Sequence, residues 1–138
     1  MDKTALFNLS YGVYVVTTWA KGKATGCTAN SAMQITSTPA TVAVSINHDN
    51  YTNECIKDTG VFALNILGEN VDPMVIGSFG FRSGRDVDKF EKLGLTKEKA
   101  NLIKAPLIKE SPVSLECKVT EIKELGSHHM FIAKILCV

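Results

Sequence analysis

A run of small and polar residues, Gly26–Ser31, is the first stretch whose side chains could bind a ligand. It reads Gly-Cys-Thr-Ala-Asn-Ser, so hydroxyls and an amide stand among residues small enough for the backbone to approach a ligand closely. Thr28, Asn30 and Ser31 could donate hydrogen bonds to a phosphate or a polyol. The same residue types also satisfy a turn or a β-bulge, and the stretch alone leaves both roles open.

A second polar cluster follows a short distance along the chain. Ser45–Asn47 ends an expected strand, and Asn50–Thr52 begins an expected helix. Free N–H groups and the helix dipole favour an anion at such a position. Asn50 and Thr52 could equally act as helix caps alone, and the two roles are compatible.

The third candidate is the segment Phe81–Phe90, where cations alternate with a hydroxyl and aromatic residues stand at both ends. Its cations could pair with a phosphate while an aromatic side chain packs on a planar ring. The alternative is a solvated loop in which Arg85, Asp86, Asp88 and Lys89 neutralise one another.

Two histidines, His128 and His129, follow Ser127 at an expected turn. An imidazole there could hydrogen-bond a cofactor or reach a nicotinamide, or the pair could simply lie at the surface. A metal site lacks a third ligand, because the only other histidine is His48.

The four cysteines form no C-x-x-C pair and stand among apolar or small residues. We therefore expect small buried hydrophobes rather than zinc ligands or disulfides. They are Cys27, Cys55, Cys117 and Cys137.

The elements that position these residues are mainly strands. Val113, Leu115, Cys117 and Val119 alternate with polar residues, which is typical of a half-buried antiparallel strand. The expected strands are Gly12–Trp19, Ala24–Gln34, Ala40–Ile46, Val61–Leu67, Val113–Val119 and Met130–Val138.

Two short helices are expected between the strands, one within Asn47–Gly60 and one over Asn70–Phe79 with Pro73 in its first turn. Residues 80–88 are expected to form an ordered surface loop. Because turns and short helices separate the strands, the sequence predicts one mainly β domain over residues 1–138, an antiparallel barrel with short appended helices.

Composition excludes some functions. Fifteen basic and fourteen acidic residues give a formal net charge of +1, so no global field would recruit nucleic acid or an anionic membrane. No apolar run reaches the roughly 18 residues of a membrane helix, and the start lacks the layout of a secretory signal. A cytoplasmic protein is expected.

The stretch Gly26–Pro39 closely resembles the flavin reductase-like family of FMN-binding split barrels, which carries a G-x-T-A-N-S run leading to a proline before the next strand. The resemblance continues through Val44–Asn47, Asn50–Thr52, Gly60–Leu67 and Ser83–Phe90, and to His128 ahead of Phe131. It covers essentially the whole chain. The start Tyr11–Thr18 is most similar to flavoredoxins and to the flavin domain of high-molecular-weight rubredoxins.

The resemblance implies a set of cofactor-binding residues but no classical catalytic side chain and no metal ligand. The residues that it implies are Thr28, Ala29, Asn30, Ser31, Ser45, Ile46, Asn47, Asn50, Thr52, Ser83, Lys89, Phe90 and His128.

It also implies the chemistry: FMN, favoured over FAD, would carry electrons from NAD(P)H to flavin or to a redox partner such as rubredoxin. An FMN-containing electron carrier without its own nicotinamide site is the alternative, and a flavin-binding or storage module is a third. No Rossmann G-x-G-x-x-G fingerprint is present, so a nicotinamide would have to dock on the flavin itself. The resemblance further implies a homodimer.

Overall fold

The computed structural model describes all residues, 1–138, and is mainly β. The strands are β1 Tyr14–Ala20, β2 Lys23–Ala29, β3 Ala32–Ser37, β4 Ala40–Asn47, β5 Val61–Ile66, β6 Lys97–Lys99, β7 Pro106–Ile108, β8 Val113–Leu125 and β9 His128–Cys137. The helices are the 3-10 helix η1 Lys3–Asn8 and the α-helices α1 Tyr51–Thr59, α2 Pro73–Phe81 and α3 Lys89–Leu93.

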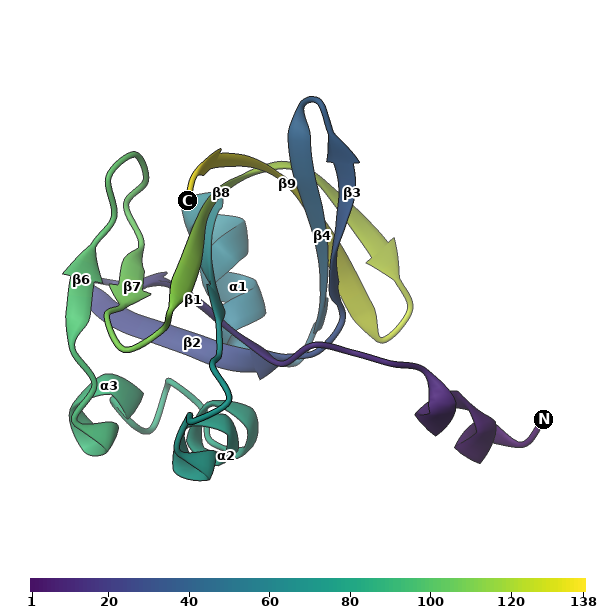
Figure 1. Cartoon of the computed structure of the whole chain (residues 1–138), viewed down its shortest axis with the longest axis horizontal. Helices are drawn as coiled ribbons and strands as arrows, with labels where there is room; N and C mark the ends of the chain where they lie inside the picture. The colour runs from purple at the N-terminus through teal and green to yellow at the C-terminus, as the bar shows by residue number, and fades with distance from the viewer.

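Seven strands form one antiparallel sheet in the order β2-β1-β5-β8-β9-β4-β3, and β6 and β7 form a separate pair. The sheet curls around a core that includes Val16, Val44, Phe62 and Phe131, and Figure 1 shows α1 packed beside this curled sheet. The expected antiparallel barrel with short appended helices is confirmed.

Tight turns connect the hairpins. Lys21 and Gly22 both have positive φ, 51° and 83°, as a two-residue primed turn requires, and they join β1 to β2. Gly126, with φ of 62°, lies in the turn between β8 and β9. The strands that each turn joins lie where the sequence predicts strands.

The helix α1 has the expected boundaries. The Asn50 side chain accepts a hydrogen bond from the Thr52 N–H at 2.9 Å, and Gly60 ends the helix in the left-handed conformation. Of the two candidate caps, Asn50 is therefore the one used.

Several expectations need correction. The strand expected over Ala24–Gln34 is two strands, because the chain leaves β2 at Asn30 and Ser31 and returns as β3 beside β4. The second helix, expected over Asn70–Phe79, spans Pro73–Phe81. It begins at Pro73 because the Asp72 side chain caps it. The loop expected over 80–88 is shorter and leads into α3. The elements η1, α3, β6 and β7 were not predicted.

Cys27, Cys55 and Cys117 are buried, as expected, and Cys137 is partly buried. The alternation expected in β8 holds only in part. Cys117 is fully buried, but Val113 is 39% exposed and Glu116, expected on the polar face, is 2% exposed. Its carboxylate accepts hydrogen bonds from two backbone N–H groups of another segment.

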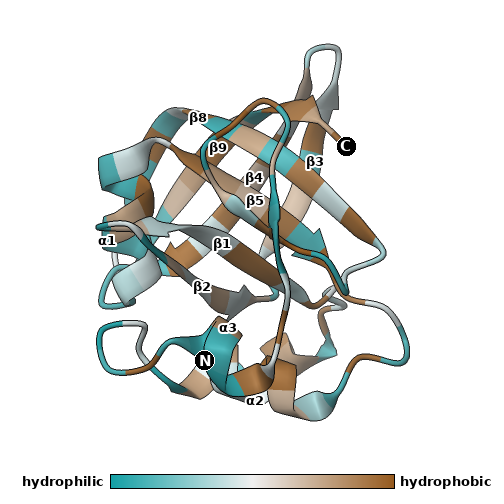
Figure 2. Ribbon diagram, turned by 90° about the vertical axis from the view of Figure 1, so that its left-hand side faces the viewer, coloured by the Kyte–Doolittle hydropathy of each residue, from teal (hydrophilic) through white to brown (hydrophobic).

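The helices α2 and α3 lie outside the sheet beneath β2, as Figures 1 and 2 both show. A second core joins them to the sheet through Val15, Val75, Phe79 and Phe90.

No helix is both long and apolar enough to cross a membrane. The helix η1 projects away from the other elements in Figure 1 and buries none of its residues.

Candidate flavin site

A surface hollow of about 330 Å³ lies where the chain passes from β2 to β3. It brings Asn30 and Ser31 together with Ser45 of β4, so two polar clusters that are separate in the sequence meet in space. The backbone secures this meeting, because the Ser45 N–H donates to the Ser31 carbonyl at 2.8 Å. The full lining is Ser10, Tyr11, Gly12, Asn30, Ser31, Ala32, Met33, Ala43, Ser45 and Met130.

The polar side chains of this hollow are largely unused within the chain. The Asn30 amide makes a single contact, accepting from the Ser31 hydroxyl at 3.3 Å, and its amide nitrogen has no partner. The Ser45 side chain makes no hydrogen bond. Met33 and Met130 add polarizable apolar walls. The hollow therefore offers donors and acceptors beside a surface that suits a flat ring.

The end of β4 is held by a residue that sequence reasoning missed. Asn53, 1% exposed, donates to the carbonyls of Ile46 at 3.1 Å and Asn47 at 3.3 Å, and its side-chain oxygen lies 3.0 Å from the His129 ring nitrogen. An asparagine on the buried side of a short amphipathic helix was the only available signal.

His128 pairs with Asn47 across the β4–β9 ladder, and its Nδ1 lies 2.8 Å from the Ser127 hydroxyl. The side chain of Asn47 accepts from the Asp49 N–H at 2.9 Å. His128 and Asn47 thus continue the strand positions of Met130 and Ser45 beyond the hollow, since alternate residues share one face.

The loop between α2 and α3 lies against the start of α1. Arg85 forms an ion pair with Glu54, and its guanidinium carbon lies 4.7 Å above the Tyr51 ring. The hydrogen bond to Arg85 lowers the pKa of Glu54 and raises that of Arg85. A side chain at Gly84 would collide with the Thr25 hydroxyl, 2.0 Å from an added Cβ. The close approach thus requires glycine.

The alternative interpretation, a solvated loop whose charges neutralise one another, is wrong. Arg85 pairs with the helix α1 instead, and Asp88 caps α3 by accepting from the Glu91 N–H at 3.1 Å. The Ser83 hydroxyl accepts from the Arg85 N–H at 3.2 Å.

Lys89 and Phe90 lie beneath the surface. The Lys89 ammonium, 3% exposed, donates to the carbonyls of Gly26 at 2.8 Å and Phe79 at 3.3 Å, and burial lowers its pKa. Phe90 is 1% exposed and packs edge-on against Phe79. Neither residue lines the hollow. Their assignment as cofactor-binding residues therefore stays a prediction.

None of the remaining predicted residues lines the hollow. Ala29 and Ile46 are buried, and the Thr28 hydroxyl is occupied by the Ile76 carbonyl of α2 at 2.8 Å. Thr52, 1% exposed, lies in the first turn of α1.

The fold and hollow together define an antiparallel split-barrel domain with a polar-lined surface site. The family profile described as "Flavin reductase like domain" matches residues 6–138. The chain therefore belongs to the flavin reductase-like family, and it is an oxidoreductase domain of that kind. The resemblance found in the sequence is confirmed.

Individual relatives agree with this assignment. The chain is 36% identical to a high molecular weight rubredoxin from Moorella thermoacetica over 98% of this chain and 58% of the relative. It is 33% identical to a ferric-chelate reductase (NAD(P)H) from Archaeoglobus fulgidus over 97% of this chain and 78% of the relative. The chain thus spans well under two thirds of the length of the first of these proteins.

Solved structures show the same fold. A flavoredoxin of Desulfovibrio vulgaris (Miyazaki F) matches with a TM-score of 0.86 and 27% identity over 94% of this chain and 69% of that chain. A flavoredoxin from Methanosarcina acetivorans matches with a TM-score of 0.83 and 29% identity over 92% of this chain and 67% of that chain.

Proposed function

We propose that the chain binds FMN and passes electrons from NAD(P)H through this flavin to free flavin or to a small redox protein such as rubredoxin. The observation that carries the proposal is the hollow lined by Asn30, Ser31 and Ser45, whose polar groups have few or no partners within the chain. Its apolar walls suit the flavin ring, and its free amide suits a ring edge that carries both donors and acceptors.

FMN supplies hydride acceptance and one-electron transfer when bound, so the protein needs to bind the cofactor and leave one face open. Asn30 would pair with the polar ring edge, and backbone N–H groups of the Ala29–Asn30 stretch would stabilise negative charge on it. Ser45 and Asn47 would follow the ribityl chain. Asn50 and Thr52 lie at the start of α1, where the helix dipole favours the phosphate, and Ser83 would join them there.

The site is completed, in this proposal, by a second copy of the chain. A volume of about 330 Å³ is near the lower end of the range for small-molecule sites, roughly 300–1,000 Å³, and FMN is a long ligand. Two exposed apolar side chains, Tyr11 and Met33, line the hollow, and Met33 is 65% exposed. A partner chain would cover them and deepen the site. A cytoplasmic location belongs to the same proposal.

An electron carrier is the alternative, and the similarity to two flavoredoxins favours it. In that case the protein retains FMN tightly but oxidises NADH and NADPH slowly, because electrons reach the flavin from another protein.

The test is anaerobic addition of NADH, and separately of NADPH, to the FMN-loaded protein while flavin absorbance is recorded. Rapid bleaching with either nucleotide, followed by recovery when free flavin or rubredoxin is added, is the expected result. Slow bleaching with tight FMN retention would favour the carrier. A flavin that neither nucleotide nor a low-potential chemical reductant bleaches in the protein would contradict both.

A further inference from the structure

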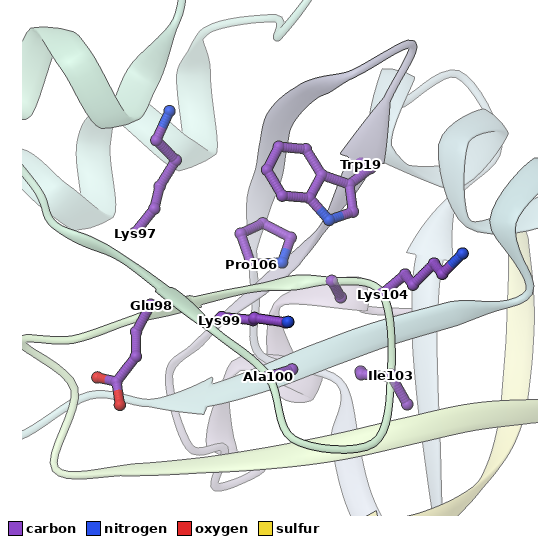
Figure 3. A pocket seen from close by; sticks show the side chains of 9 residues that line it. Trp19, Lys97, Glu98, Lys99, Ala100, Ile103, Lys104 and Pro106 are labelled. Atoms are coloured by element: carbon purple, nitrogen blue, oxygen red, sulfur yellow. The ribbon is translucent and has the colours of Figure 1, made fainter.

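A second cavity, of about 480 Å³, lies on another part of the molecule, where the β6–β7 pair and the segment between them meet β1. It shares no lining residue with the flavin hollow. Its walls come from Trp19 of β1, Lys97–Ala100, and Ile103–Pro106, and Figure 3 shows these side chains around it. The volume is in the range of sites for small organic ligands, roughly 300–1,000 Å³.

The wall of this cavity is held in place by a buried carboxylate. Glu116, 2% exposed, accepts from the Asn101 N–H at 2.6 Å and from the Leu102 N–H at 2.7 Å. Burying a carboxylate is costly unless it is hydrogen-bonded, so these two bonds tie residues 100–105 firmly to β8. The cavity is therefore shaped before any ligand arrives.

Further buried contacts support the same wall. The Thr17 hydroxyl donates to the Pro106 carbonyl at 2.5 Å, and both Thr17 and Asn65, which bonds to it at 3.0 Å, are fully buried. Ala100 and Ile103 belong to a small apolar core beneath the cavity. A surface loop that served only to connect two strands would not need so many buried polar anchors.

The charges around the cavity are unbalanced. Lys97, Lys99 and Lys104 stand against Glu98, three positive charges and one negative, which leaves +2. The ion pairs of the protein involve none of these lysines. All three are exposed, so their ammonium groups are free to meet an anion.

The remaining lining of the cavity is apolar and includes two ring side chains. Trp19, the only tryptophan, is partly buried, and Figure 3 shows its ring system and the Pro106 ring among the lining side chains. An indole packs well on another planar ring.

We propose that this cavity is a binding site for a small aromatic anion, with its ring against Trp19 and Pro106 and its anionic group at Lys99 and Lys104. A mononucleotide and an aromatic carboxylate share this chemistry. The site is separate from the flavin hollow and does not depend on the function proposed there.

The unique tryptophan reports on its own cavity. The protein is loaded with one FMN per chain, freed of excess FMN, and titrated with AMP and separately with benzoate. Binding should shift the single indole N–H resonance of Trp19 in a saturable way. Adenosine, which lacks the charge, and inorganic phosphate, which lacks the ring, should each bind at least about fivefold more weakly than AMP. Saturation by AMP alone identifies a nucleotide-type ligand, and saturation by benzoate alone an aromatic carboxylate.

The double variant Lys99→Ala, Lys104→Ala should weaken binding of the effective probe by about tenfold or more, while Lys118→Ala, an exposed lysine of β8 outside the cavity, should not. FMN is itself an aromatic anion, so the two sites are separated by comparing the FMN-free protein with protein that holds one FMN per chain and no free FMN. A probe that binds only the FMN-free protein has entered the flavin hollow. That result, an unshifted Trp19 resonance with both probes, or equal affinity in the double variant would overturn the proposal.

Discussion

Asn30 carries more of the flavin-binding proposal than any other single side chain. Its amide nitrogen has no partner within the chain, and its oxygen meets only the Ser31 hydroxyl. A residue that only supported a turn would use these groups in hydrogen bonds to the backbone. The unused amide is therefore the clearest sign at the residue scale that a polar ligand completes the hollow.

We expect Asn30→Leu to weaken FMN binding about ten- to hundredfold, because a polar flavin edge would lose its partners at a cost of roughly 1–3 kcal/mol. The melting temperature of the flavin-free protein should stay nearly unchanged. Equilibrium titration with FMN measures the first effect and thermal unfolding the second. Gln34→Leu, a similar change on β3 outside the hollow, is the control and should leave FMN affinity intact. Unchanged FMN affinity in a folded Asn30→Leu protein would remove the residue from the site.

Two buried thiols should limit stability at alkaline pH. Burial raises the pKa of Cys27 from 9.0 to about 11 and that of Cys117 from 9.0 to about 12. Between these values the unfolded chain loses thiol protons that the folded chain keeps. Each thiol thus contributes stability that is fully present below pH 9.0 and is lost as the pH rises through the folded-state pKa.

The free energy of unfolding should therefore fall by as much as about 1.4 kcal/mol per pH unit for each thiol above pH 9.0. Cys27→Ala should show a shallower slope than the natural protein in denaturant unfolding measured at several alkaline pH values, whatever its stability at neutral pH. Parallel slopes for the two proteins would show that this thiol does not contribute.

Elements that local sequence signals determine could be predicted, whereas elements held by polar contacts from distant strands could not. The hairpins β1–β2 and β8–β9 and the helix α1 follow from local signals: alternation, turn residues with positive φ, and an asparagine–glycine pair of caps. The strands β6 and β7 are three residues each and carry no such pattern. Their positions depend on Asn65 and Glu116, which act from other strands.

The candidate site divides in the same way. The polar stretches Gly26–Ser31 and Ser45–Asn47 could be singled out because their residue types suit a ligand, but sequence spacing cannot reveal that Asn53 and His129 secure the end of β4. Nor could it reveal that Lys89 turns inward, since a buried lysine depends on which carbonyls the fold places nearby.

The buried anchor can be tested by Glu116→Gln. Glutamine keeps the size of the side chain but offers one acceptor oxygen where two N–H groups, of Asn101 and Leu102, need one each. We expect the free energy of unfolding to drop by about 1–3 kcal/mol, measured by denaturant unfolding. Glu98→Gln, the same change at an exposed position of β6, should stay within about 0.5 kcal/mol. Equal effects of the two substitutions would mean that Glu116 does not hold the segment.

For the whole molecule, contacts within a single chain do not explain what stabilises the helix η1. It buries none of its own residues, and Phe7 is 86% exposed. Leu6 and Leu9 are also more than half exposed, as is Leu125 at the end of β8. So short a helix gains little stability without tertiary contacts, which a second copy of the chain would supply.

We therefore expect light scattering to give the mass of two chains and Phe7→Asp to shift the protein toward one chain, with weaker FMN binding. Phe81→Asp changes an equally exposed aromatic, 93% exposed at the end of α2, and should leave the dimer intact. A flavin-saturated protein with the mass of a single chain would contradict the dimer proposal.

FMN binding in the hollow where the chain passes from β2 to β3, beside β4, can be measured by titrating the purified, flavin-free protein with FMN while flavin fluorescence and absorbance are followed. We expect saturable binding of one FMN per chain, weakened by Asn30→Leu. A folded protein that shows no saturable FMN binding would contradict the proposal.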